Sequence, residues 1–472
     1  MKTFTRIAAM SAAALTLAGV LTAGTLARQP AAPVPEGSCG RFDITKSTAY
    51  DTPASPIGYP WRRDLPQAAG DGAHAWDGKQ PQDWEAYMAA FLSEVRAGGL
   101  TIENGKAAMK ADAEWWTAPW MDYGDNGREK NLGLTKERKP GKGDLAPGSG
   151  TGRQVWAVGF YNREGARALG QVFSDPCNPQ VPVSGWTMPE GAASFKLLFT
   201  TATGGDASYL TGSPEVLAFV DGGAGQRTQQ TLRLLQMDIA VRDSSSPSGW
   251  VMGTYIWQGP KKGDGLFDNL VPVGLMWGND GAAAASPRDA MATLTETRLN
   301  PALAGVVWRG PGQTWDERPW PGFQGRLNGP ADNMLSTCLS CHALAQWPRS
   351  KALSILPLGP KYTMATLNDA DVRADLARDY LRNVPGGTLT EPAEATPTAT
   401  WGGARPLDYS LQLEAAFTRM CSACLDGALT GPTPAMCQIK GAANYVSTPN
   451  CKGGNPLRAL IEKVTTDRPS RQ

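Results

Sequence analysis

The sequence predicts an α+β fold in which a mainly antiparallel β domain, residues 28–325, is followed by a mainly α domain, residues 326–472. Between about residues 154 and 280, short apolar runs are each bounded by Gly, Pro, Asp or Ser, which is the pattern of an antiparallel sheet, sandwich or barrel. Beyond about residue 325, helical pieces alternate with Pro- and Thr-rich linkers. This change predicts a domain boundary near residue 325, to within about ten residues.

Local periodicity predicts the individual elements. Apolar residues recur at helical spacing from Asp83 to Arg96, and Gly98-Gly99 ends the pattern, so an amphipathic helix is expected there. Residues 139–152 are polar and glycine-rich, as in a loop. Helical spacing returns at 368–383 and 411–420. Strands are expected within five apolar runs: 154–162, 194–203, 234–243, 249–259 and 271–280.

The first 27 residues have the layout of a secretory signal peptide. Lys2 and Arg6 precede an uncharged stretch from Ile7, which ends in the small-x-small pattern Thr25-Leu26-Ala27 that signal peptidase cleaves. An uncleaved membrane anchor is the alternative, because the stretch is long enough to span a bilayer. Its Ala, Gly and Thr residues make it weakly apolar, so we expect cleavage and no integral membrane span in the mature chain.

Composition and charge exclude several classes of function. The chain is 41% hydrophobic and 19% charged, as expected of a globular protein. Without Lys2 and Arg6 its formal net charge changes from +1 to −1, so it has no electrostatic footprint for nucleic acid or an anionic membrane surface. It also has no P-loop, Rossmann fingerprint or Gly-x-Ser-x-Gly elbow.

One motif indicates a specific chemistry. Cys338-Leu-Ser-Cys341-His342 uses two of the eight cysteines and one of the two histidines, and chance would produce it in fewer than about one in a thousand chains of this composition. On a helical turn, positions i, i+3 and i+4 share a face, so two sulfur atoms and an imidazole can address one flat object. A porphyrin fits this pattern, with a thioether from each cysteine and the histidine as iron ligand.

Zinc and a redox dithiol are the alternatives for this motif. Zinc needs about four nitrogen or sulfur ligands, but the nearest other cysteine is Cys421 and the only other histidine is His74. A thioredoxin-like dithiol begins a helix in a βαβ unit, and no such pattern surrounds Cys338. The expected export signal also fits haem c, which is attached outside the cytoplasm. The sequence therefore favours haem.

The region from about residue 328 to 385 resembles a c-type cytochrome domain. The resemblance implies a cytochrome c-like fold and one covalently bound haem c, attached through Cys338 and Cys341, with His342 as the proximal iron ligand. The whole chain is also similar to a group of uncharacterised bacterial cytochrome c family proteins. That wider likeness implies no activity.

The resemblance also suggests where the other axial ligand lies. Residues 367–384 are similar to the closing helix of such domains, which places Met364 at the position of the family's sixth iron ligand. Gly359-Pro360 corresponds to the Gly-Pro whose carbonyl fixes the ligand histidine. An open sixth position is an alternative, and three residues are rival ligands: Met420, Met436 and His74.

Six cysteines remain, and in an exported protein they are most simply three disulfides, for which sequence alone permits 15 pairings. If pairing respects the boundary near residue 325, Cys39 joins Cys177, and the other four form a disulfide-tied C-terminal cap. Residues 421–427 resemble a second haem motif, but Leu425 replaces the histidine, so a second haem is disfavoured. The four cysteines of the cap are Cys421, Cys424, Cys437 and Cys451.

The remaining histidine and the tryptophans have plainer interpretations. His74 could be a second axial ligand or a general base, but an exposed loop histidine is favoured. The grouped tryptophans could line a sugar or quinone groove, but core packing is favoured. They lie in two groups: Trp115, Trp116 and Trp120, and Trp308, Trp315 and Trp320.

Together these features predict a periplasmic electron-transfer protein with one covalent haem c. Its partner would be a redox protein or a small redox substrate. The first alternative is a haem-containing periplasmic oxidoreductase whose substrate site lies within residues 28–325. The second is a haem-based ligand sensor, which requires an open or displaceable sixth position.

Overall fold

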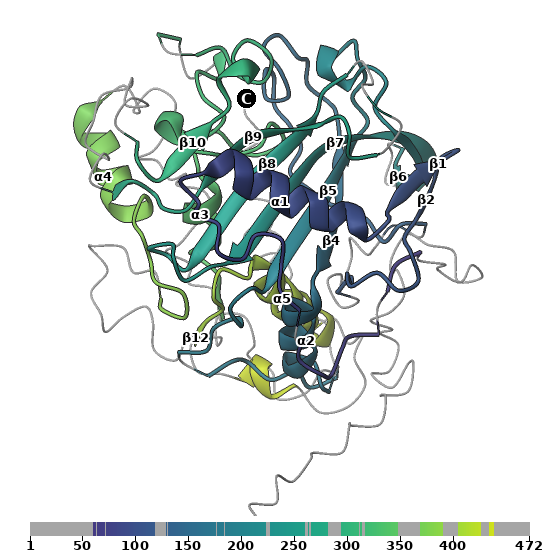
Figure 1. Ribbon diagram of the computed structural model, residues 1–472, viewed down its shortest axis with the longest axis vertical. Coiled ribbons are helices and arrows are strands. Elements are labelled where there is room, and N and C mark those ends of the chain that lie inside the picture. Colours follow the sequence, from purple (N-terminus) through teal and green to yellow (C-terminus); the bar gives the residue numbers. More distant parts are fainter. Residues whose placement is uncertain are drawn as a thin grey trace, which may run out of the picture. The chain divides into compact units, whose positions relative to one another are not determined.

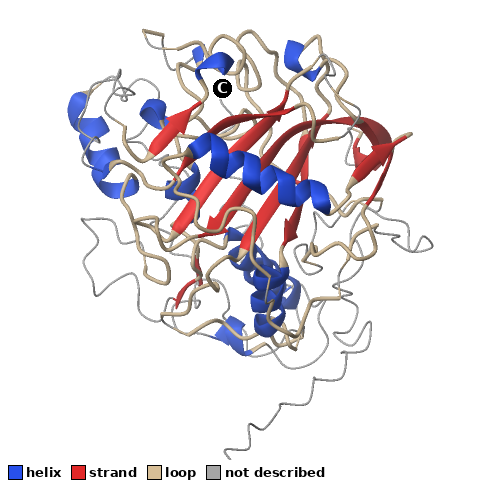
Figure 2. Ribbon diagram, viewed as in Figure 1, coloured by secondary structure: helices blue, strands red, loops and turns tan. Residues whose placement is uncertain are grey.

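An antiparallel sheet forms the centre of the described structure (Figure 2). Its strand order is β10-β9-β8-β7-β5-β4-β3, with β6 pairing β7 outside this path. The strands are β3 (Thr135–Lys136), β4 (Val155–Tyr161), β5 (Ala193–Thr200), β6 (Glu215–Asp221), β7 (Arg227–Arg242), β8 (Trp250–Trp257), β9 (Leu270–Met276) and β10 (Thr297–Leu299). The computed structural model describes residues 60–438 except for 63, 71, 119–128, 130, 176, 184, 223–226, 260–262, 264–265, 282–293, 311, 314–316, 348–368, 390–404 and 426–433.

Helices and small two-stranded sheets surround this sheet (Figure 1). The helices are α1 (Trp84–Ala97), α2 (Arg163–Val172), α3 (Cys338–His342), α4 (Ala370–Tyr380) and α5 (Leu411–Leu425). The short strands are β1 (Thr101–Glu103) paired with β2 (Lys106–Ala108), and β11 (Gln346–Trp347) paired with β12 (Arg405–Pro406). The 3-10 turns are η1 (Ser208–Leu210), η4 (Pro301–Leu303), η6 (Phe323–Gly325) and η8 (Ala435–Gln438).

The antiparallel sheet and the α+β class are as predicted. Each of the five predicted runs contains a strand, and the three predicted helices correspond to α1, α4 and α5. The sequence analysis missed α2 and β6. Helix α2 begins at the cap residue Asn162, whose side chain accepts a hydrogen bond from the backbone of Gly165.

Strand β7 organises the sheet. It is 16 residues long, and its first half pairs with β6 while its second half lies between β5 and β8. The register with β5 shifts between Leu198 and Phe199, which is a bulge. Beyond the bulge, Lys196 of β5, Asp238 of β7 and Thr254 of β8 are directly opposite one another. These three residues therefore share one face of the sheet.

Helix α1 crosses the opposite face of the sheet (Figure 1). Its buried residues include Tyr87, Met88 and Phe91, which join the strands' apolar side chains in one core. The hydroxyl of Tyr255 on β8 donates to the carbonyl of Met88 at 2.6 Å. A Cβ at Gly253 would lie 2.7 Å from the Met88 sulfur, so glycine is needed for this close approach.

A second core lies on the face that carries Asp238. It contains apolar residues of the strands together with residues that follow position 325, among them Leu339 of α3 and Phe417 of α5. The rings of Phe417 and Phe173, just after α2, stack with centroids 5.8 Å apart. Described residues on both sides of position 325 thus share this core. The domain boundary near 325 stays a prediction.

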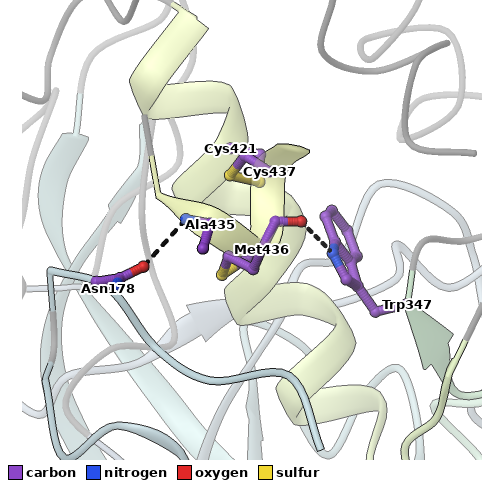
Figure 3. Close-up of a disulfide and its surroundings, with 6 residues drawn as sticks. All are labelled: Asn178, Trp347, Cys421, Ala435, Met436 and Cys437. Atoms are coloured by element: carbon purple, nitrogen blue, oxygen red, sulfur yellow. Dashed lines mark hydrogen bonds between the residues drawn. A yellow bond between two sulfur atoms is a disulfide. The ribbon is translucent and has the colours of Figure 1, made fainter. Parts of the chain in front are cut away.

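A disulfide ties η8 to α5 (Figure 3). Cys421 and Cys437 are 16 positions apart and lie among the four cysteines expected to pair in the C-terminal region. The carbonyl of Met436 accepts a hydrogen bond from the Trp347 indole at 3.1 Å, so η8 also contacts the segment that follows α3. Cys177 is disulfide-bonded as well, and its expected partner, Cys39, lies outside the described residues.

In the part of the chain that the structure describes, no helix has both the length and the apolar character to cross a bilayer. The predicted signal peptide, residues 1–27, lies outside that part. Its cleavage therefore stays a prediction.

Removing the Cys421–Cys437 disulfide should destabilise the protein. The bond joins cysteines 16 positions apart, and closing a loop of this length in the unfolded chain corresponds to about 3 kcal/mol in the free energy of unfolding. The double variant Cys421→Ser, Cys437→Ser leaves no unpaired thiol at this pair and should unfold at lower urea concentration. Equilibrium urea unfolding measures the difference from wild type. An unchanged midpoint and slope would show that the bond contributes nothing to stability.

Candidate functional site

The five residues of the Cys-x-x-Cys-His motif form one helical turn, α3. Thr337 caps it, because its side-chain oxygen accepts a hydrogen bond from the backbone of Ser340 at 3.0 Å. Leu339 and Ser340 face inward and are buried. Three side chains occupy the other side and are partly exposed, and these are the ones expected to share a face: Cys338, Cys341 and His342.

A buried polar network fixes the orientation of α3. The hydroxyls of Thr337 and Ser340 each lie 2.9 Å from the side-chain oxygen of Asn279, to which both donate. The Asn279 amide donates in turn to the carbonyl of Arg382 at 2.7 Å. Asn279 and Thr337 are fully buried, so these hydrogen bonds have no competition from bulk water.

Two buried arginines hold the loop that leads into α3. Arg326 donates to the carbonyl of Asn279 at 2.6 Å and to that of Asp280 at 3.0 Å. Arg318 donates to the carbonyls of Pro321 at 2.9 Å and Gly329 at 2.7 Å. Burial lowers the pKa of each guanidinium to about 10, so both remain charged at neutral pH. Their donors satisfy carbonyl groups that the irregular loop would otherwise bury unpaired.

His342 presents one defined ring nitrogen. Its Nδ1 lies 2.9 Å from the carbonyl oxygen of Tyr409. Since a carbonyl can only accept, Nδ1 carries the proton and Nε2 carries the lone pair. The Tyr409 hydroxyl donates to the Val384 carbonyl at 2.6 Å, which holds this residue in place. Burial lowers the pKa of His342 to about 4, so the ring is neutral, the form that binds a metal.

The Cys338 thiol does not have the properties of a redox-active cysteine. Neither Cys338 nor Cys341 is in a disulfide, and the Cys338 thiol donates to the side-chain oxygen of Asn328 at 3.4 Å. Burial, followed by the nearby Asp238 and Asp332, raises the pKa of Cys338 well above its ordinary value. Redox-active cysteines have lowered pKa values instead, so this environment opposes the dithiol hypothesis.

The chemistry of the donor set fits a covalently attached haem. Two thiols that are not in a disulfide and a neutral imidazole with Nε2 unprotonated lie on one side of one helical turn. The hydrogen bond of Nδ1 to a backbone carbonyl is the usual way in which a metal-binding histidine is oriented. Within the described ranges, no group of three or more His, Cys, Asp or Glu side chains is arranged to hold a metal ion.

The candidates for the sixth ligand differ in how far the structure describes them. Met364 and Gly359-Pro360 lie outside the described residues, so their roles stay predictions. Met420 of α5 and Met436 of η8 are buried in the core on the Asp238 face of the sheet.

The grouped tryptophans that the structure describes are buried, as expected of core residues: Trp115, Trp116, Trp308 and Trp320. Trp120 and Trp315 lie outside the described residues.

The sequence analysis missed a polar cluster next to Cys338. It consists of Lys196, Gln236, Asp238, Thr254 and Asp332, which come from three strands and from the loop before α3. Two of these residues gave a signal in the sequence, since Lys196 and Asp238 interrupt apolar strand runs on the side that faces a core. Asp332 gave none, because only the tertiary fold brings it to the sheet.

His74 is half-buried in an ion-pair cluster, and is not the exposed loop histidine that the sequence favoured. Its Nδ1 lies 2.8 Å from a carboxylate oxygen of Glu94 on α1, and its Nε2 lies 3.4 Å from Glu164 on α2. The ring stacks on Trp76, which belongs to the core on the α1 face of the sheet. With carboxylates at both nitrogens and this position, His74 is not arranged as an iron ligand at α3.

A cavity of about 750 Å³ lies beside His74. Its lining includes Glu94, Glu164, Trp115 and Arg163. The two carboxylates overcome the opposing effect of burial and raise the pKa of His74 to about 10. His74 is therefore a cation at neutral pH, which makes it a poor general base.

Comparisons with known proteins identify no relative. No protein-family model matches the chain, and no curated protein or solved structure matches it either. The site is therefore interpreted from its own residues.

Replacing His74 should destabilise the protein in a pH-dependent way. The folded-state pKa of about 10 is above the ordinary value of 6.5, so the ion pairs stabilise the fold fully below about pH 6.5 and lose their effect as the pH rises through about 10. The variant His74→Gln should lose roughly 1–3 kcal/mol at pH 6 and much less at pH 10. Urea unfolding at both pH values measures this, and an equal loss at both would contradict the charged state of His74.

Proposed function

We propose that this protein is an exported electron-transfer protein that carries one covalent haem c at α3. Cys338 and Cys341 supply the two thioether sulfurs, and His342 is the proximal iron ligand. The observation that carries the proposal is the Cys-x-x-Cys-His motif on one helical turn, with Nδ1 of His342 bonded to the Tyr409 carbonyl and Nε2 left with its lone pair. When bound, the haem supplies a one-electron change between Fe(II) and Fe(III).

The residues around α3 have separate tasks in this proposal. Thr337, Ser340 and Asn279 hold the helix so that its three functional side chains keep one direction. The Tyr409 carbonyl fixes the tautomer and rotation of His342 and makes Nε2 more basic. The buried core beneath α3 excludes water from one side of the site. A site that only exchanges electrons needs a fixed helix, an oriented histidine and little water, and it does not need to bind a large substrate.

We infer that the segment from residue 326 to 472 acts as a cytochrome c-like haem domain, with Met364 as sixth ligand, and that residues 1–27 direct export to the periplasm. The electron partner is a redox protein or a small redox substrate. No further haem is proposed.

A second candidate function is an oxidoreductase with its own substrate site. One observation favours it: the charged cluster around Lys196, Asp238 and Asp332 lies beside Cys338 on the sheet face that α3 covers. Such a cluster could exchange protons with a substrate while electrons leave through the haem. Electron transfer remains the first proposal, because it needs only the groups at α3.

Replacing His342 should change the haem spectrum, whereas replacing the only other histidine should not. Full-length wild type made in a host that attaches haem c should show the haem c spectrum in alkaline pyridine. His342→Ala should give a misligated haem or no holoprotein, because the proximal nitrogen is lost. His74→Ala is the matched control and should keep the wild-type visible spectrum. Iron-free wild type, non-covalent haem, or a normal spectrum for His342→Ala would each refute the assignment.

Carbon monoxide separates a closed electron carrier from an open site. If Met364 is the sixth ligand, the reduced wild type should bind CO slowly or not at all, because the position is filled. Met364→Ala should then bind CO rapidly, and Met420→Leu, at a buried core position, should behave as wild type. Stopped-flow spectroscopy measures the rates. Rapid CO binding by the wild type would rule out Met364 ligation and support a sensor or an enzyme.

A further inference from the structure

We propose that Asp238 takes up a proton when the site at α3 receives an electron and releases it when the electron leaves. The inference rests on the proposed function, because the electron must reside at α3. Its basis is a carboxylate at the centre of the sheet that is tied to the loop before α3 and lies within electrostatic reach of Cys338.

Asp238 is held in one orientation by neutral donors. On β7 it lies between Lys196 of β5 and Thr254 of β8. The Thr254 hydroxyl donates to its Oδ1 at 2.9 Å, and the Gln236 amide donates to the same oxygen at 2.7 Å. Its side chain is 22% exposed, so a proton can still be exchanged with water.

A second carboxylate is joined to Asp238 through one amide. Nε2 of Gln236 also donates to Oδ2 of Asp332 at 3.0 Å, and Asp332 accepts from the Gly329 backbone at 3.1 Å. A Cβ at Gly329 would collide with the side-chain amide of Gln236, so a larger residue there would displace this amide from its hydrogen bonds to the two carboxylates. The two carboxylates and the start of the α3 loop therefore form one rigid cluster.

The groups around Asp238 keep the pKa of its carboxyl close to neutral pH. Burial, and next the negative charge of Asp332, raise its pKa to about 7, while Lys196, whose Nζ is 3.8 Å from Oδ2, partly offsets them. Thr254, its neighbour on β8, carries no charge. The titratable groups that face this cluster are Lys196 of β5, Glu137 after β3, Asp332 before α3 and Cys338 of α3.

An added electron changes this balance in a defined direction. Negative charge gained beside Cys338 disfavours the ionised form of Asp238, because like charges repel through a poorly screened interior. When a one-electron reductant delivers an electron, the Asp238 carboxylate binds up to one proton from hydronium or a buffer acid in the solvent and becomes a carboxylic acid. Oxidation reverses the step: the electron leaves to the redox partner and the carboxylic acid returns its proton to the solvent. The reduction potential must therefore fall as the pH rises through the titration range of Asp238.

The reduction potential of the haem-loaded full chain tests the proposal. Wild type should show a potential that falls between about pH 6 and pH 8, with a limit of about 59 mV for each tenfold fall in proton concentration in a one-electron step. Asp238→Asn should keep the haem spectrum and lose most of this dependence. Glu215→Gln removes an exposed carboxylate that pairs with Arg233 on β7, and this matched control should keep it.

A second variant tests the same idea if Asp238→Asn does not fold. Lys196→Met removes the cation that favours the ionised form, so the range of pH dependence should move to higher pH. A redox-active haem whose potential does not change with pH, or an Asp238→Asn variant with the wild-type dependence, would overturn this inference alone. A wild-type chain without redox-active haem would overturn the proposed function and this inference together.

Discussion

The anchoring of α3 to Asn279 is the constraint on which the candidate site depends. A five-residue helix has too few internal hydrogen bonds to hold itself, so its geometry must come from tertiary contacts. Thr337 and Ser340 provide them by donating to the same buried oxygen. Asn279 follows β9, and its carbonyl accepts a hydrogen bond from Arg326, so the sheet and the loop that leads into α3 meet at this residue. The direction of Cys338, Cys341 and His342 follows from that junction.

The sheet supports α3 and also places charged side chains near it. Its α1 face is covered by an apolar core, whereas its other face combines apolar packing with the polar row of Lys196, Asp238 and Thr254. Charges at such a position cost free energy unless they are paired or hydrogen-bonded. Here Lys196 and Asp238 form an ion pair, and Asp238 also accepts a hydrogen bond from Thr254. In the proposed function, their electrostatic reach to Cys338 gives a physical reason for a large β structure around a small Cys-x-x-Cys-His motif. These charges set the electrostatic environment of Cys338.

The sequence could predict what depends on local pattern. Apolar runs located β4, β5, β8 and β9, and the spacing of Cys338, Cys341 and His342 indicated their shared face. The first half of β7 is polar and pairs only with β6, so no apolar run marked it. Helix α2 has few large apolar residues, which hid its periodicity. The partners of His74 are 20 and 90 positions away in sequence, and only the fold brings them together.

The proposed function requires one haem bound covalently to Cys338 and Cys341. Trypsin should release the motif in a single peptide, Leu327 to Arg349, because no lysine or arginine lies between these ends. The mature protein is made in a host that attaches haem c, and its accessible thiols are alkylated before digestion. Mass spectrometry of this peptide then tests the covalent attachment directly. We expect the peptide mass plus one haem, with neither cysteine alkylated. A peptide without haem that carries two alkylated cysteines would contradict it.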